Sequence, residues 1–244
     1  MRWATADMVL LELRAGSRGY GGPHSRLRSG HGSRGRVRAG VRCFEPVMTI
    51  AVSRTRTVRC TCSTRRCSAT GGTAHLLIGH SAGAYYAQAM AARRPAQVAG
   101  LALVCPLLPG LRDVPEHRVV AGSGEIGDDV FRSYFVIQTP EMLERYERYV
   151  APAAALVDQA ALERIGERWA LTPDHAPAYA GPTVIVAGRL DSTVGYAAAT
   201  DLVDHYPHAS LAVVDDAGHA LPHEQPELLR ALLADWLARV ERSN

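Results

Sequence analysis

The chain of 244 residues is long enough to bury the core of one large α/β domain, and its 47% hydrophobic and 21% charged residues are typical of globular proteins. Its longest apolar stretch, VAGLALVCPLLPGL, is interrupted by Pro106 and Pro109, which argues against a membrane-spanning helix. We therefore expect a soluble, cytoplasmic protein.

The net charge of +3 hides an uneven distribution. Residues 1–74 contain 14 arginines and three acidic residues, a net charge of +11, whereas residues 75–244 contain 13 arginines and 21 acidic residues, a net charge of −8. Because the larger part is acidic, the overall charge does not indicate binding to nucleic acid. The basic segment also has few aromatic residues that could stack on bases, so we expect no nucleic-acid partner.

The first 74 residues form an atypical segment that is rich in Arg, Ser and Gly. The short apolar runs MVLLEL, VRCF and MTIAV are compatible with strands, but no helical period appears. The CTCSTRRC motif has no matching second pair of ligands, so it predicts no metal site. Our hypothesis is that residues 15–72 are translated from a shifted reading frame of a GC-rich gene, which translation of the other two frames would test. The alternatives are a transit peptide and a basic arm.

From residue 75 onward the hydrophobic pattern becomes regular. Short apolar runs predict buried strands at 75–80, 97–106, 182–189 and 209–216. Helical patterns follow at 82–94, 193–206 and 226–242. Strands that alternate with helices predict a mostly parallel sheet with helices on both faces, which is an α/β fold.

Residues 111–180 interrupt this alternation. The sequences EMLERYERYV and ALVDQAALERIGERWAL are typical of amphipathic helices, and Thr139 with Pro140 marks a helix start. We interpret this segment as a helical lid inserted between the core segments 75–110 and 181–244, and the alternative is a pair of ordinary crossover helices. Six aromatic residues of the insertion line a substrate pocket or form its own core: Phe131, Tyr134, Phe135, Tyr146, Tyr149 and Trp169.

The sequence GHSAG, residues 79–83, lies between a predicted strand and a predicted helix. A sharp turn at this place would strain the backbone of Ser81 and expose its hydroxyl, and it requires small residues two positions away on each side. The start of the following helix favours negative charge, so the N–H of Ala82 is a candidate oxyanion donor. The pattern alone is weak, but its position between strand and helix makes Ser81 a candidate nucleophile.

A serine hydroxyl needs a general base, and that base needs an orienting acid. Asp191 and His219 each follow a predicted strand, at the sheet edge where parallel sheets bind ligands. Asp113 is the alternative acid. Among other histidines near the motifs, we expect His80 to point away from Ser81 as a packing residue and His223 to face the surface or the mouth of the site.

Three segments together resemble the α/β-hydrolase superfamily, in particular bacterial serine hydrolases with a helical cap. They are LLIGHSAGAYYAQAMAARRPAQVAGLALVCP, VAGRLDSTVGY and DDAGHALPHEQPELLRALLADWL, within residues 75–244. The resemblance implies that Ser81 is the nucleophile, Asp191 the acid and His219 the base, with Ala82 as one oxyanion donor and with no cofactor or metal. The segment MVLLELRAGSRGYGG lacks the His-Gly loop that supplies the second oxyanion donor in the family, and SGHGSRG lacks the strand and aspartate expected before the family's Gly-His-Gly motif, so this donor is unassigned.

The resemblance also implies an activity. We expect a serine hydrolase that cleaves an ester or related acyl bond of a small, apolar substrate through an acyl-enzyme. The alternatives are a carbon–carbon bond hydrolase of the same fold and a degenerate hydrolase-fold protein without catalysis. Because the loss of one oxyanion donor typically lowers turnover by about 10²–10³-fold, the atypical N-terminal segment predicts impaired activity.

Overall fold

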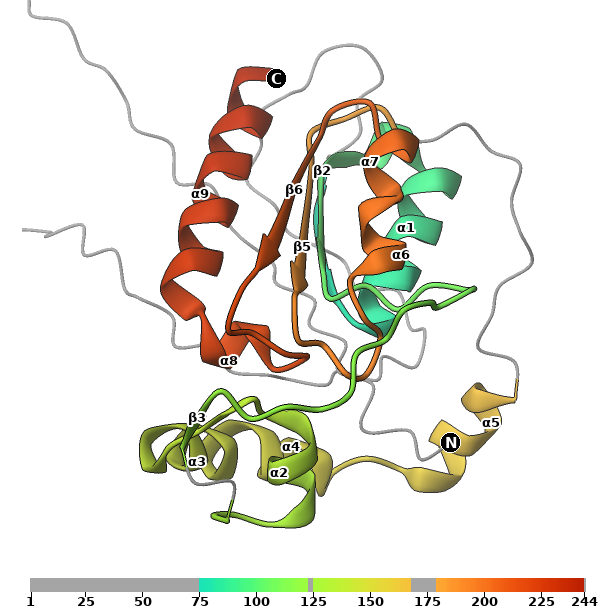
Figure 1. The fold of residues 1–244 in the computed structure, drawn as a ribbon. Helices are drawn as coiled ribbons and strands as arrows, with labels where there is room; N and C mark the ends of the chain where they lie inside the picture. The colour runs from blue at the N-terminus through green and yellow to red at the C-terminus, as the bar shows by residue number, and fades with distance from the viewer. Residues whose placement is uncertain (1–74, 123–124, 168–178, 244) are drawn as a thin grey trace, which may run out of the picture.

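In the part of the chain that the structure describes, four parallel strands form the central sheet, in the spatial order β1-β2-β5-β6 (Figure 1). They are β1 (His75–His80), β2 (Val98–Val104), β5 (Thr183–Gly188) and β6 (Ala209–Val214). This computed structural model describes residues 75–122, 125–167 and 179–243. The predicted N-terminal strands and the Arg-rich segment lie outside the described residues. The four strands predicted after residue 75 are confirmed.

Helices cover both faces of the sheet (Figure 1), which explains why the strands read as nearly continuous apolar runs. Successive residues of a strand point to opposite faces, so each strand contributes to two cores. One core lies under α9 (Pro226–Ser243) and includes Ile78, Ala102, Val104, Val184, Val186, Trp236 and Val240. The other lies under α1 (Ala82–Arg93) and includes Leu77, Ala84, Ala87, Leu101, Leu103 and Ile185.

The C-terminal helix α9 packs closely on β2. Gly100 of β2 permits this approach, because a Cβ at this position would lie 2.6 Å from Cγ2 of Val240 and 2.8 Å from Cζ2 of Trp236. The indole Nε1 of Trp236 also donates to the carbonyl of Pro182 at 2.9 Å, so this buried ring has its polar group satisfied. The helix predicted from the leucine spacing is confirmed.

The helix predicted at 193–206 differs from the structure. Two short helices occupy this stretch, α6 (Ala197–Thr200) and α7 (Leu202–His205). The helical structure begins late because Gly195 has a φ of 68°, which a right-handed helix does not allow, and because Thr193 and Val194 donate to the side chain of Asp191 instead.

The 111–180 insertion contains more than the predicted helices. A two-stranded parallel sheet joins β3 (Ala121–Gly122) to β4 (Ile137–Gln138), and it was not predicted. The described helices are α2 (Asp129–Tyr134), α3 (Pro140–Arg145), the π-helix η2 (Tyr146–Val150), α4 (Ala151–Ala154) and α5 (Gln159–Gly166). The hydroxyl of Thr139 caps α3 as predicted, accepting from the N–H of Met142 at 3.3 Å.

The regular helix expected over EMLERYERYV instead changes to a π-helix at Tyr146. This residue is buried, and its hydroxyl donates to Oδ2 of Asp128 at 2.9 Å. Its ring centroid lies 5.4 Å from that of Phe131 and 5.9 Å from that of Phe135. The π turn thus begins at a buried residue of the insertion's core.

Six aromatic residues of the insertion were expected either to line a substrate pocket or to form the core of the insertion, and four of them lie in this core. The four are fully or almost fully buried, and they pack with Met142, Val150 and Ala220: Phe131, Tyr134, Phe135 and Tyr146. Tyr149 is half-buried, and Trp169 lies outside the described residues. These four aromatic side chains therefore stabilise the insertion itself.

Helices α2 to α4 and α8 (Leu221–Glu224) lie together at the end of the sheet where its strands terminate (Figure 1). In particular, α3 packs against α8. The insertion is therefore placed at the carboxyl edge, where open parallel sheets bind ligands. Within the described part of the chain, no helix has both the length and the apolar character needed to cross a bilayer.

Candidate active site

Ser81 lies on the turn between β1 and α1, with φ 54° and ψ −123°. A residue other than glycine rarely adopts a positive φ, and such strain costs about 1–3 kcal/mol. Two backbone hydrogen bonds hold the turn: the N–H of Ser81 donates to Val104 at 3.0 Å, and its carbonyl accepts from Leu107 at 3.1 Å. The strain expected from the motif is therefore present.

Gly79 shows why the motif needs a small residue before the serine. A Cβ at this position would lie 2.4 Å from the carbonyl oxygen of Gly83 and 2.5 Å from the backbone nitrogen of Ala84. Both atoms belong to the backbone of α1 and cannot rotate away. The turn can therefore bring the strand against the helix only if residue 79 is glycine.

The structure brings together Ser81, His219 and Asp191, which are far apart in the sequence. The hydroxyl of Ser81 lies 3.0 Å from Nε2 of His219, and Nδ1 of His219 lies 2.7 Å from Oδ2 of Asp191. All three side chains are buried. This arrangement lets the histidine take a proton from the hydroxyl while the carboxylate fixes its tautomer.

Asp191 is held ionised by its surroundings. Burial alone would raise its pKa, but the charge and hydrogen bond of His219 and two backbone N–H donors outweigh burial, so the pKa lies below its ordinary value. The two N–H groups belong to Val194 and Thr193, which each donate to Oδ1 at 2.9 Å. The carboxylate therefore has acceptor bonds on both oxygens.

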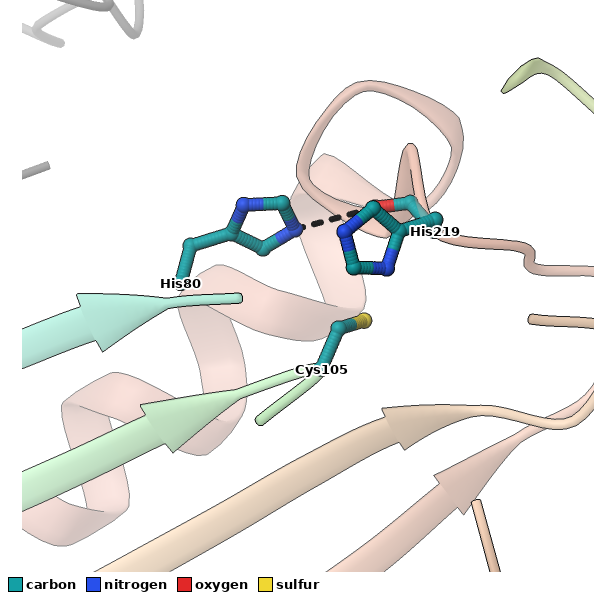
Figure 2. Close-up of side chains that lie close together, drawn as sticks. All are labelled: His80, Cys105 and His219. Atoms are coloured by element: carbon teal, nitrogen blue, oxygen red, sulfur yellow. Dashed lines mark hydrogen bonds between the residues drawn. The ribbon is translucent and has the colours of Figure 1, made fainter. Parts of the chain in front are cut away.

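His80 packs against His219 (Figure 2). The two ring centroids are 4.8 Å apart, and Nε2 of His80 donates to the backbone carbonyl of His219 at 2.9 Å. Burial, together with the nearby His219, lowers the pKa of His80 to about 3. His80 is therefore a neutral packing residue that supports the backbone of His219.

Cys105 is a buried neighbour of the site that the motifs did not single out. It directly follows β2 with a φ of 42°, and Figure 2 shows its side chain pointing toward His219. Its position just past the end of a strand, the same signal that marks Asp191, could have identified it. Burial and the neighbouring Asp191 raise the pKa of the thiol well above its ordinary value, so the sulfur stays protonated.

His80, Cys105 and His219 offer potential metal-ligand atoms within 4.8 Å of one another (Figure 2). The donor chemistry does not fit a zinc ion, because zinc binds thiolate and the raised thiol pKa disfavours that form. The ring nitrogens of His219 are also both hydrogen-bonded, and Nε2 of His80 carries the proton that it donates. We therefore assign no metal to this cluster.

Two alternative site residues lie elsewhere. Asp113, the alternative acid, is exposed and pairs with Arg112 at 3.1 Å. His223 is 4% exposed, so the prediction that it faces the surface or the mouth of the site is wrong. The short helix α8 turns its ring inward toward Phe135, with 5.9 Å between the ring centroids.

Comparisons with known proteins agree with this architecture. The model of the alpha/beta hydrolase family matches residues 10–232, a range that begins within the Arg-rich segment. Monoacylglycerol lipase ABHD6 of Rattus norvegicus is 28% identical over 187 residues, which cover 67% of this chain and 55% of the relative. The Bos taurus protein of the same name is 27% identical over 191 residues, with 69% and 56% covered. The matched region thus spans just over half the length of these curated relatives.

Solved structures show the same fold. An alpha/beta superfamily hydrolase from Oenococcus oeni PSU-1 has a TM-score of 0.63 and 23% identity, and the match covers 70% of this chain and 68% of that one. A membrane phospholipase A, described as a bacterial virulence factor, has a TM-score of 0.52 and 26% identity, with 70% and 59% covered. Together with the family match over most of the sequence, they show that the chain belongs to the α/β hydrolase family.

Proposed function

We propose that the protein is a serine hydrolase that cleaves an ester or related acyl bond of a small, apolar substrate. The observation that carries this proposal is the continuous hydrogen-bonded path from Asp191 through His219 to Ser81, at 2.7 Å and 3.0 Å. It is supported by family membership and by the strained turn that holds Ser81.

In the proposed mechanism, Oγ of Ser81 attacks the carbonyl carbon of the substrate while Nε2 of His219 takes the hydroxyl proton. His219 then gives this proton to the leaving oxygen, and the acyl group remains on Ser81 as an ester. Water, deprotonated by His219, attacks the carbonyl carbon of this ester, the bond to Oγ breaks to release the acid, and His219 returns the proton to Oγ of Ser81. Asp191 stays ionised throughout and stabilises the imidazolium, as its lowered pKa requires.

Ala82 is the proposed first oxyanion donor. It is the first residue of α1, so its N–H is one of the groups that a helix leaves without an intrahelical partner. The helix dipole adds positive potential at the same place. Negative charge that develops on the substrate carbonyl oxygen is therefore stabilised directly beside Ser81.

We further propose that the 111–180 insertion acts as a lid. One observation that supports this role is the position of the insertion over the carboxyl ends of the strands (Figure 1). Another is Tyr134 of the insertion, whose ring lies edge-on to that of His219, with 5.5 Å between the ring centroids. An aromatic side chain at this position favours an apolar acyl or alcohol group. Because the curated relatives are named monoacylglycerol lipases, glycerol monoesters belong among the candidate substrates.

A fluorophosphonate probe tests the proposal, since it labels a serine only if the hydroxyl is activated. We expect labelling of the wild-type chain, loss of labelling in Ser81→Ala and His219→Ala, and unchanged labelling in the exposed control Ser133→Ala. Absence of labelling in the folded wild type would favour a degenerate hydrolase fold. Hydrolysis rates for p-nitrophenyl esters of increasing chain length, a monoacylglycerol and a vinylogous diketone then separate ester hydrolysis from carbon–carbon bond hydrolysis.

A further inference from the structure

We propose that Glu224 is a positioning residue for His219, whose carboxylate fastens the loop before His219 to the backbone of the insertion. The inference rests on the proposed function, since it assigns a role within the same site. Glu224 is the last residue of α8, and its side chain is 6% exposed. A buried carboxylate is costly unless hydrogen bonds satisfy it, so its partners identify what it does.

The carboxylate accepts three backbone hydrogen bonds from two segments that are far apart in the chain. Oε2 accepts from the N–H of Gly218 at 2.7 Å. Oε1 accepts from the N–H of Val136 at 2.7 Å and from that of Ile137 at 3.3 Å. One side chain therefore ties the insertion to the loop that carries the candidate base.

The bond to Gly218 acts on His219 because Gly218 directly precedes it. The residues on either side are also fixed: the carbonyl of Ala217 accepts from the N–H of Leu190 at 2.9 Å, and the carbonyl of His219 accepts from His80 at 2.9 Å. Three consecutive residues thus each have a backbone group held by a different element. The Glu224 carboxylate holds the N–H of the middle residue, Gly218. It thereby fixes the backbone from which the imidazole ring of His219 extends.

The other two hydrogen bonds act on the insertion. A Cβ at Gly218 would lie 2.8 Å from Cγ1 of Val136, so the insertion packs directly on the loop at this point. Val136 lies two residues after Tyr134, whose ring contacts His219. Displacement of the insertion would therefore pull on the backbone beside His219, and Glu224 links the two movements.

Only a carboxylate can accept hydrogen bonds from N–H groups through both of its terminal oxygens. A glutamine at this position has one acceptor oxygen, and its NH₂ group would face an N–H donor at the other side. Glu224→Gln keeps the size and shape of the side chain and releases either Gly218 or the Val136 segment. Because a displacement of about 1 Å can cost about 10²-fold in rate, we expect Ser81 in this variant to react with the fluorophosphonate 10- to 100-fold more slowly.

The experiment compares second-order labelling rates of the wild type, Glu224→Gln and Val240→Ala. Val240 lies in the core between α9 and β2, against Gly100, so its truncation lowers the melting temperature through a cavity there. We expect Glu224→Gln to be labelled slowly and Val240→Ala to be labelled at the wild-type rate. This difference should remain even if the two variants have similar melting temperatures. Equal rates in the two variants would overturn the positioning role.

Two further outcomes are distinguishable. If Glu224→Gln does not fold, Gly218→Ala takes its place, because the added methyl group separates the loop from Val136, and a wild-type rate in this variant overturns the proposal. If the folded wild type does not react at all, the proposed function fails, and amide hydrogen exchange still reports on Glu224. Faster exchange at Gly218 and Val136 in Glu224→Gln supports the link, and unchanged exchange refutes it.

Discussion

At the scale of single residues, the site depends on groups whose placement by itself lowers the stability of the folded protein. Ser81 has a strained backbone, and Asp191 is a fully buried carboxylate. Each is held by neighbours that offset its cost: the turn of Ser81 is fixed by backbone hydrogen bonds to β2 and the segment after it, and Asp191 accepts bonds on both oxygens. Such local costs are common where a protein positions groups for chemistry.

Asp191→Asn is expected to lower kcat by about 10⁴-fold. An asparagine can turn its NH₂ group toward Nδ1 of His219, which moves the ring proton to Nε2 and prevents proton transfer from Ser81. Steady-state ester hydrolysis measures the effect, with circular dichroism to show that the variant folds. The matched control is Asp113→Asn at the exposed alternative acid, which we expect to keep wild-type activity. A comparable loss in the control would return Asp113 to consideration.

At the scale of secondary-structure elements, the sheet is stabilised by helices that approach it closely. Small residues allow this, such as Gly100 under α9 and the buried alanines of α1. Large side chains then fill the remaining space, and Trp236 is the largest fully buried one in the described part of the chain. Packing of this kind makes the core sensitive to changes in volume.

Trp236→Ala is expected to lower the free energy of unfolding by about 3–5 kcal/mol, because it leaves a cavity between α9 and β2. The carbonyl of Pro182 keeps its hydrogen bond from Leu101, so no buried acceptor becomes unsatisfied. Urea denaturation gives the difference. Leu228→Ala, at an exposed position of the same helix, should change stability by less than about 0.5 kcal/mol. A small change in the free energy of unfolding in Trp236→Ala would show that the packing of α9 on β2 contributes little to stability.

At the scale of the whole molecule, buried ionisable groups connect the sheet edge, α8 and the insertion. Burial lowers the pKa of His223 to about 4, and it raises the pKa of Glu224 to about 7. The two shifts affect stability in opposite directions. The histidine favours the folded state at higher pH, whereas the contribution of the carboxyl group is present at low pH and is lost as the pH rises through 7.

His223 should therefore make the protein sensitive to acid. In the unfolded chain the histidine takes up a proton below pH 6.5, but in the folded state only near pH 4, so stability falls as the pH decreases between these values. The shift corresponds to a loss of about 3 kcal/mol. Urea denaturation of His223→Gln at pH 7 and pH 4.5 should show a smaller difference than the wild type. The exposed His205→Gln is the control, and an unchanged pH dependence in His223→Gln would contradict the assignment.

Much of the fold could be predicted from local patterns. Buried strands and the α9 helix leave clear signals, because burial on two faces gives continuous apolar runs and burial on one face gives a period of three to four residues. Short elements left no such signal. The two-residue strands β3 and β4 depend on their pairing with each other, and the break before α6 depends on single local features, the positive φ of Gly195 and the hydrogen bonds to Asp191, which leave no periodic pattern.

The sequence by itself determined the family resemblance, the parallel α/β architecture and the candidates for nucleophile, base and acid, because the glycines and strand ends that mark them are local features. Only the tertiary structure decided which acidic side chain meets His219, that His80 and Cys105 lie beside it, and that Glu224 binds Gly218 and Val136. These contacts join residues up to 139 positions apart. Their distances follow from the register of the strands and the packing of the insertion, which no local pattern specifies.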